Sequence, residues 1–391
     1  MMALEGIKVL DMTRLLPGPV CSLLLADYGA DVLKVEDTQQ GDHMRWIKPF
    51  AKRESIYYLA INRNKKSIKL NLKSSEGKEI FKKLVQKYDV VIESFRPGVM
   101  DRLGVGYSEL RKINPGLVYC ALSGYGQSGP LVNKVGHDLN YLALGGLLGL
   151  NGLRGGSPTP PGVQIADLGA GAMMCAFGIL TALLAREKTG KGQFIDVAMF
   201  DGVIFWLAMQ ISKYALDGEN PACGMQTFTG KYPSYNVYET KDGKYISLGN
   251  VEFKFWERFC RIIQREDLIE EHLPEGQKQE EVLKILQDIF KSKTRGEWET
   301  MLEDVETCFE PVNEIGEVFS HPQVQHRQMI VDQIHPTEGQ IKQVGFPVKL
   351  SETPGALRMP PPGYGEHSEA ILRELGYSPE AVTRLKQDGV I

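Results

Sequence analysis

The amino-acid sequence predicts an α/β protein in which a parallel sheet is covered by helices and a second, smaller domain is set within the chain. Over residues 1–120, short β-branched runs alternate with helical ones, which is typical of a parallel sheet with helices on its faces. From about residue 225, a hairpin pattern and charged helical segments replace this alternation. The length of 391 residues also favours about two domains, because one hydrophobic core rarely serves so long a chain.

Five strands of the sheet are expected from short apolar runs. They span residues 7–11, 31–36, 67–71, 90–93 and 117–122. Helices are expected over 19–28, ending near Gly29, and over 75–88. Because ligands bind outside the carboxyl ends of parallel strands, the loops after these strands are the expected place for a site.

The second half of the chain is first rich in small residues and then polar. Two long helices, a hairpin and a helical C-terminal segment are expected there, and they span 169–186, 200–216, 237–248 and 366–389. Charged helical segments follow the hairpin to about Glu306. A smaller domain between about 225 and 325 is the natural division.

Composition and charge exclude several classes of protein. With 42% hydrophobic and 24% charged residues, the chain has an ordinary globular profile, unlike a collagen-like or disordered protein. The 45 Lys and Arg residues against 49 Asp and Glu give a net charge of −4, so no basic field attracts nucleic acid or an anionic membrane. The six cysteines form no C-x-x-C pair, which favours free thiols in a reducing compartment. Because we find no secretory pattern and no apolar run that fits a membrane span, a cytoplasmic location is expected.

Common catalytic motifs are missing from the sequence. There is no P-loop, no H-E-x-x-H, no G-x-S-x-G, and no G-x-G-x-x-G after the first strand. One G-x-G-x-x-G spans Gly124–Gly129, but Pro130 follows it and leaves little room for the helix that would hold a pyrophosphate. Dinucleotide oxidoreductases, NTPases, zinc hydrolases and α/β-hydrolases are therefore not favoured.

Three titratable residues are candidates for catalysis. His137 lies among Leu, Gly and Ala, where a titratable group is costly unless it is functional or well bonded; a core histidine bonded to a carbonyl is the alternative. Asp167 comes just before small residues that begin a long helix. One interpretation is that it caps that helix, and another is that it sits beside an oxyanion site at the helix N-terminus. The two interpretations are compatible. Glu252 follows the second hairpin strand and by itself indicates only a helix-start carboxylate.

A set of short motifs spread over nearly the whole chain carries a resemblance to a known family. The motifs are Leu4–Asp11, Pro17–Pro19, Asp27–Glu36, Asn64–Ser67, Glu93–Gly98, Arg102–Gly104, Gly124–Pro130 and Thr189–Gln193. Together they resemble the family III CoA-transferases, the CaiB/BaiF group, and within it the α-methylacyl-CoA racemases most closely. The resemblance implies a Rossmann-like large domain formed from both chain ends, a smaller α+β domain and an interlocked homodimer. We therefore expect a large CoA-binding domain over 1–200, a linker over 201–224, the small domain over 225–325 and a return to the large domain over 326–391.

The resemblance also implies roles for the three candidates. Asp167 matches the aspartate that is a nucleophile in the transferases, where it forms an anhydride and then an enzyme–CoA thioester, and one of two bases in the racemases. His137 matches the second base of the racemases, and Glu252 matches the glutamate that pairs with it. The transferases of the family that the chain resembles carry other residues at the position of His137. Those like formyl-CoA transferase also carry a glycine run that this chain lacks after Leu248. Epimerisation of a 2-methylacyl-CoA is therefore the first expectation, CoA transfer between carboxylic acids the second, and a catalytically silent CoA-binding protein the third.

Acid–base chemistry agrees with the first expectation. Racemisation removes a weakly acidic α-proton and returns it to the opposite face, so it needs one deprotonated and one protonated group. A neutral imidazole at His137, held in one tautomer by Glu252, and a protonated carboxyl at Asp167 fit these roles. Neither a metal nor an organic cofactor is expected, because the CoA thioester itself supplies the acidity.

The resemblance also implies contacts with CoA, since Asn64, Lys65 and Lys66 match a loop that touches the nucleotide in relatives. Further contacts are expected from the loop after a predicted strand that holds Ser94, Phe95, Arg96 and Arg102, and from the segment around His137 with Lys134, Asp138 and Tyr141. For each basic residue the alternative is a solvated surface charge. In the interlocked homodimer that the resemblance implies, Glu252 faces the partner's His137 and the partner's Asp167. The expected partners are thus an acyl-CoA and a second copy of the chain, with no nucleic acid and no membrane.

Overall fold

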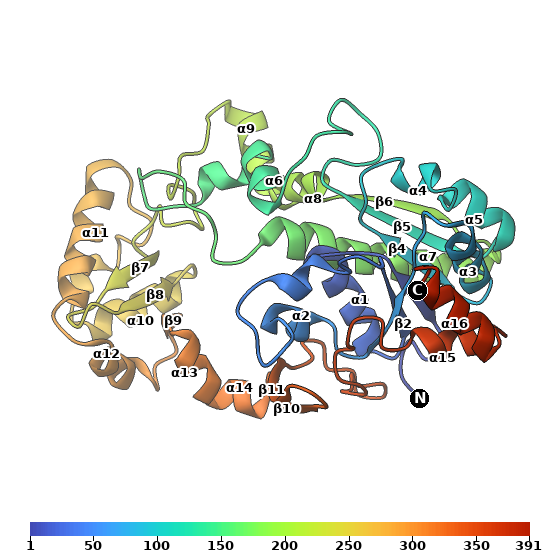
Figure 1. The fold of residues 1–391 in the computed structure, drawn as a ribbon. Coiled ribbons are helices and arrows are strands. Elements are labelled where there is room, and N and C mark those ends of the chain that lie inside the picture. Colours follow the sequence, from blue (N-terminus) through green and yellow to red (C-terminus); the bar gives the residue numbers. More distant parts are fainter. The chain divides into compact units, whose positions relative to one another are not determined.

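The structure is a computed structural model that describes residues 1–391, and the chain divides into two compact units. The large unit comprises Met1–Gly145, Val163–Trp206 and Pro322–Ile391, and the small unit comprises Gly146–Gly162 and Leu207–His321. The predicted linker over 201–224 is divided between the units: 201–206 belongs to the large unit and 207–224 to the small one, which also takes in the earlier stretch Gly146–Gly162. Both ends of the chain contribute to the large unit (Figure 1).

A six-stranded parallel sheet forms the centre of the large unit, in the order β3-β2-β1-β4-β5-β6. The strands are β1 Lys8–Asp11, β2 Asp31–Glu36, β3 Lys65–Lys69, β4 Val90–Glu93, β5 Val118–Ser123 and β6 Phe194–Ala198. This is the order of a doubly wound fold, whose ligands bind outside the carboxyl ends of the strands where the order reverses. The predicted α/β class and parallel sheet are confirmed. The sixth strand, β6, was not among the predicted ones.

The rest of the large unit is mostly helical. Its helices are α1 Pro17–Asp27, α2 Ile56–Ile61, α3 Ser75–Val85, α4 Val99–Arg102, α5 Tyr107–Ile113, α6 Asp138–Leu144, α7 Met174–Thr189, α8 Met199–Trp206, α14 Pro322–His326, α15 Ser368–Glu374 and α16 Pro379–Gln387, with the short turns of η1 at His43–Trp46. The C-terminal part adds the hairpin β10 Ile330–His335 and β11 Gly339–Val344. Side chains of α15 and α16 share one apolar core with β1, β3 and α3. The return of the C-terminal segment to the first sheet is therefore part of the folded core.

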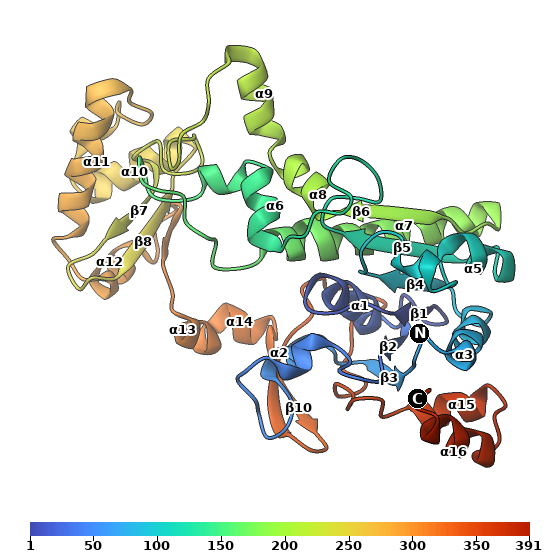
Figure 2. The ribbon, with the colours of Figure 1, turned by 45° about the horizontal axis from the view of Figure 1, so that its top comes forward.

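The central helix is continuous from η3, Ala166–Met173, into α7. Its first turns are wound as a π-helix, a form that is rare and frequent near functional sites. Figure 2 shows α7 lying along the sheet beside β5 and β6. By length and composition the span Ala166–Thr189 would pass as a membrane helix. Its contacts with α1, α8 and β5 make it a core helix of this unit.

The small unit is an antiparallel sheet covered by helices. Its elements are η2 Leu147–Leu150, α9 Ala208–Asp217, β7 Tyr235–Glu239, β8 Tyr245–Gly249, α10 Phe253–Ile262, η4 Glu266–Leu268, α11 Gly276–Phe290, α12 Arg295–Leu302, β9 Phe309–Pro311 and α13 Ile315–Ser320. The predicted hairpin is present, and β9 adds a third strand to it. The helix predicted over 200–216 is interrupted at Leu207, and its two parts, α8 and α9, belong to different units. The core is aromatic, with Trp256, Phe259, Phe290 and Trp298 buried.

Candidate functional site

The candidate site is a cavity of about 660 Å³ in the large unit. The loops that follow β1, β4 and β5 border it, and the N-terminal turn of η3 closes part of it. This position lies at the carboxyl edge of the sheet, where β1 and β4 are neighbours and the strand order reverses. The site is thus where the predicted sheet places a ligand.

Asp167 lines the cavity from the first turn of η3. Small residues after it allow other elements to approach: a Cβ at Gly171 would lie 3.0 Å from Pro17 of α1, and one at Gly202 of α8 would lie 2.5 Å from the Ala170 side chain. Larger side chains would push these helices apart. The run of small residues therefore fixes the helix that bears Asp167 against the rest of the site.

The N-cap interpretation of Asp167 is wrong. The residue in the N-cap position is Ile165, and no side chain caps η3. Instead, the backbone amide of Asp167 donates a 3.0 Å hydrogen bond to Oδ1 of Asp138, at the start of α6. Burial, reinforced by the negative charge of Asp138, raises the pKa of Asp167 to about 7. Near neutral pH this carboxyl is therefore divided between its protonated and ionised forms.

His137 also lines the cavity, at the N-terminus of α6. Its backbone amide donates to Oδ1 of Asn140 at 3.0 Å, which holds the start of the helix in place. The side chain is exposed, so the alternative of a core histidine is excluded. His137 and Asp167 come from segments joined by the Asp138 hydrogen bond, and both border the same space.

Two tyrosines support the His137 loop. The hydroxyl of Tyr141 donates to the carbonyl of Gly136, and its ring packs edge-on against Tyr125 at 5.2 Å between centroids. A Cβ at Gly124 or at Gly136 would come within 2.5 Å or 2.8 Å of the Tyr141 ring, so the loop needs glycine on both sides. The hydroxyl of Tyr125 is buried and has no partner in the protein, although Tyr125 lines the cavity. Sequence reasoning missed this residue, which has a free donor for a ligand.

Comparison with known proteins now decides the family. The model of CoA-transferase family III matches residues 4–368 of this chain. The chain belongs to this family. Succinyl-CoA:glutarate CoA-transferase of Mus musculus is 36% identical over 400 residues, covering 100% of this chain and 91% of the relative. Alpha-methylacyl-CoA racemase of Homo sapiens is 34% identical over 398 residues, covering 100% and 98%. A CAIB/BAIF family protein from Brucella suis has a TM-score of 0.83 at 30% identity, covering 96% of this chain and 99% of that one.

The family III cavity is rich in cationic side chains. Arg96 and Lys134, both predicted to contact CoA, line it together with Ser94 and Phe95. Arg102 is not among the lining residues and ends the short helix α4. Two further basic side chains line the cavity that the sequence analysis did not single out, Arg14 and His43. Arg14 lies in the loop after β1, so its place in the chain was a usable signal.

Arg14 is held by two neighbours. Its Nη2 lies 2.7 Å from Oδ2 of Asp37, and its guanidinium carbon lies 5.4 Å from the centroid of the Phe95 ring. Phe95 is itself fixed, because its amide donates to Glu93 at 2.7 Å. Arg14 thus brings a cation to the cavity in a defined orientation.

The predicted contacts of Asn64 and Lys65 with CoA find no support in the structure, because both side chains are buried and used within the fold. Asn64 donates to Asp27 and accepts from the amides of Arg358 and Met359. The Lys65 ammonium donates to the carbonyl of Pro19 at 2.8 Å and to Asn62 at 2.9 Å. Neither residue lines the cavity, and both join the N-terminal strands to their surroundings.

Lys66 and Glu252 also lie outside the lining of this cavity. Lys66 pairs with Asp31 at 3.0 Å and is partly exposed. Glu252 belongs to the small unit, where it is exposed and occupies the N-cap position of α10 without a side-chain cap bond. Of the residues predicted for the site, the cavity therefore brings together His137, Asp167, Tyr141, Lys134, and the loop Ser94–Arg96, with Asp138 bonded directly beneath Asp167.

Proposed function

We propose that this family III protein epimerises the α-carbon of a 2-methylacyl-CoA thioester by two-base proton transfer. The observation that carries the proposal is the pairing of His137 and Asp167 as two titratable groups on one cavity, with the pKa of Asp167 raised to about 7. A group with a pKa near the working pH exchanges protons most effectively in both directions. The alpha-methylacyl-CoA racemases of Homo sapiens and Mus musculus, 34% and 33% identical to this chain, support the same assignment.

The reaction needs three functions from the chain. One base removes the α-proton, a second acid returns a proton to the opposite face, and donors stabilise the enolate oxygen in between. His137 and Asp167 supply the two acid–base groups. The Leu168 amide at the start of η3 already donates to the carbonyl of Gln164 at 2.9 Å, so the unpartnered hydroxyl of Tyr125 is the candidate donor to the enolate oxygen. In the interlocked homodimer that we expect, Glu252 faces the partner's His137 and is proposed to keep that imidazole in one tautomer.

CoA transfer between carboxylic acids is the second candidate. Transferases that act on succinyl-CoA and glutarate in mouse and human, 36% identical to this chain, favour it. Here the ionised Asp167 would attack the thioester carbonyl, release CoA and form a mixed anhydride. Returning CoA would attack the aspartyl carbonyl, release the acyl group as its carboxylate and leave an enzyme–CoA thioester. This role needs an ionised carboxylate, whereas burial keeps much of Asp167 protonated at neutral pH.

Incubation of one enantiopure 2-methylacyl-CoA in heavy water separates the two functions. An epimerase introduces deuterium at C2 and racemises the thioester without any added acid. A transferase leaves C2 unchanged and moves CoA only after a free carboxylate is supplied. No exchange and no transfer, with CoA thioester still bound, would leave a binding protein without activity.

Chemical trapping tests the role of Asp167 directly. If Asp167 acts as an acid–base group, Asp167→Asn should keep the fold and lose isotope exchange at C2. Wild-type protein treated with acyl-CoA and then with hydroxylamine or borohydride should carry no modified aspartate. A modified Asp167 found by mass spectrometry would establish the nucleophile and replace epimerisation by CoA transfer.

A further inference from the structure

Asp42 connects two segments of the cavity wall through one carboxylate oxygen. Its Oδ1 accepts the amide of Leu15 at 2.9 Å and the amide of Met44 at 3.0 Å. Leu15 belongs to the loop after β1, and Met44 to η1, which Asp42 caps. The side chain of Asp42 is fully buried, so neither amide has water as an alternative acceptor on that side.

Both segments border the ligand space. Arg14 and Leu15 line the cavity from the first segment, and His43 lines it from the second. Leu15 has φ of +64°, a conformation that a leucine adopts at a cost and that persists only where its surroundings hold it. The hydrogen bond from the Leu15 amide to Asp42 is a contact that holds it.

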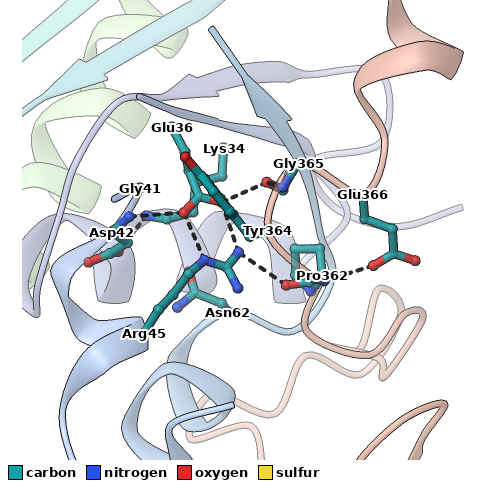
Figure 3. A network of polar contacts seen from close by, with 12 residues as sticks. Lys34, Glu36, Gly41, Asp42, Arg45, Asn62, Pro362, Tyr364, Gly365 and Glu366 are labelled. Carbon is teal, nitrogen blue, oxygen red and sulfur yellow. Dashed lines mark hydrogen bonds and ion pairs between the residues drawn. The ribbon is translucent and has the colours of Figure 1, made fainter. Parts of the chain in front are cut away.

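Lys34 fixes Asp42 from the other side. The Lys34 ammonium lies 2.8 Å from Oδ2 of Asp42 and donates at 2.9 Å to the carbonyl of Thr13, in the loop that leads to Leu15. Both side chains have zero exposure. Figure 3 shows Asp42 beside Lys34 and Glu36, which accepts the Asp42 amide at 3.0 Å and also binds Arg45. The loop after β1 is thus bonded at both Thr13 and Leu15 to one buried pair.

We infer that Asp42, held by Lys34, is a positioning residue for the acyl-CoA site: it sets the Arg14–Leu15 loop and His43 in the arrangement that receives the ligand. The inference rests on the proposed function only in taking an acyl-CoA as the ligand. It predicts an effect on ligand affinity that exceeds the effect on stability, because a disordered loop must be ordered again each time the ligand binds.

Two double variants separate positioning from the burial of charge. Lys34→Met/Asp42→Asn removes both charges but keeps an amide oxygen that accepts from Leu15 and Met44. Lys34→Met/Asp42→Ala removes the same charges and the acceptor. Neither leaves an unpaired buried ion at this pair, which is the change that most often prevents folding.

The measurements are the melting temperature, the dissociation constant of an acyl-CoA by calorimetry, and the KM and kcat of isotope exchange at C2. We expect the Asn double variant to bind within about threefold of wild type, and the Ala double variant to bind on the order of 10-fold more weakly with a matching rise in KM. Ser74→Ala removes a helix cap of α3 that accepts from Gly77 at 3.0 Å. It should lower the melting temperature and leave the dissociation constant unchanged.

Equal affinity in the two double variants, with normal binding by wild type, would overturn the positioning role and leave the proposed function intact. The same holds if Ser74→Ala weakens binding as much as the Ala double variant, because general stability would then explain the loss. Normal binding by wild type without exchange at C2 would overturn epimerisation alone, and the affinity comparison would still decide the role of Asp42. Wild type that binds no acyl-CoA would overturn both.

Discussion

The Asp138 carboxylate accepts the backbone amide of Asp167 at 3.0 Å, so the residue next to His137 in sequence fixes the other titratable residue of the same cavity. The same carboxylate contributes a negative charge that, after burial, raises the pKa of Asp167. The start of α6 therefore supplies one candidate base, His137, and through Asp138 raises the pKa of the other, Asp167. The predicted role of Asp138 in binding CoA remains a prediction, while its contact with Asp167 is direct.

Asp138→Asn should shift the pH profile of C2 exchange. The amide oxygen keeps the acceptor for the Asp167 amide, while the negative charge is lost, so the pKa of Asp167 falls from its value of about 7. Because the ionised form of Asp167 is then present at lower pH, the limb of the profile set by Asp167 moves to lower pH. The check is kcat against pH for wild type and variant.

Asp138→Ala is the companion of that variant. It removes the charge and the acceptor together, so we expect the same direction of shift and a further loss of kcat of about 10-fold or more from misplacement of Asp167. A pH profile that stays in place in both variants would contradict an electrostatic role of Asp138.

Glu93→Gln should remove a pH dependence of stability. Glu93 ends β4 and is buried, and burial raises its pKa to about 8, although the Phe95 amide acts to lower it. The folded protein keeps the proton up to about pH 8, while the unfolded chain releases it near its ordinary pKa of 4.5. The unfolding free energy of wild type should therefore fall as pH rises through this window, by about 2–5 kcal/mol relative to the variant.

Urea unfolding at pH 5 and pH 9 measures this effect. The difference in unfolding free energy between wild type and variant is compared at the two pH values, so the contributions of other titrating groups cancel. The glutamine oxygen still accepts from Phe95, so the loop after β4 should remain in place. A difference that is the same at both pH values would contradict the raised pKa of Glu93.

Self-association is the third prediction. One side of η3 and α7 exposes apolar residues at helical spacing, and α8 adds two more. They are Met173, Phe177, Leu180, Leu184, Phe205 and Trp206. An exposed stripe of this kind marks an interaction site, and we propose that a second copy of the chain covers it.

Sedimentation should show a dimer of the wild-type protein at micromolar concentration. Phe177→Asp should shift the equilibrium toward monomer, while Lys188→Ala at the polar end of the helix should not. A stable wild-type monomer would contradict the homodimer.

The sequence was sufficient for most of the parallel sheet, because buried β-branched runs such as Val90–Glu93 have few alternatives. It missed β6, whose residues Phe194–Ala198 include Asp196 and are only partly buried, as expected of a strand at the edge of a sheet. It also read 200–216 as one helix, since periodicity continues across Leu207 and the division into units depends on tertiary contacts.

The candidate site was predictable where polar residues stood in an apolar context, as with His137 and Asp167. The resemblance implied a nucleotide contact for Lys65, but the structure buries this side chain beside Asp11, and a buried ion pair and a solvent-facing phosphate ligand look the same in sequence. Arg14 and Tyr125 were missed. The place of Arg14 after the first strand was a usable signal, but its orientation beside Phe95 and the unpartnered hydroxyl of Tyr125 follow only from the folded structure.

A double-mutant cycle tests the last prediction, that Glu252 acts through His137. Removal of a general base lowers the rate by roughly 10²–10⁴-fold, so His137→Ala should reduce exchange at C2 by that amount. Glu252→Gln alone should lower kcat less. If the glutamate only orients the imidazole, it has nothing left to orient once His137 is gone, and the double variant should be no slower than His137→Ala.

Lys254→Ala, two residues further along the chain than Glu252, is the control and should leave the rate unchanged. If the losses of the two single variants multiply in the double variant, Glu252 acts independently of His137. Full activity in His137→Ala, together with a trapped adduct on Asp167, would instead replace epimerisation by CoA transfer.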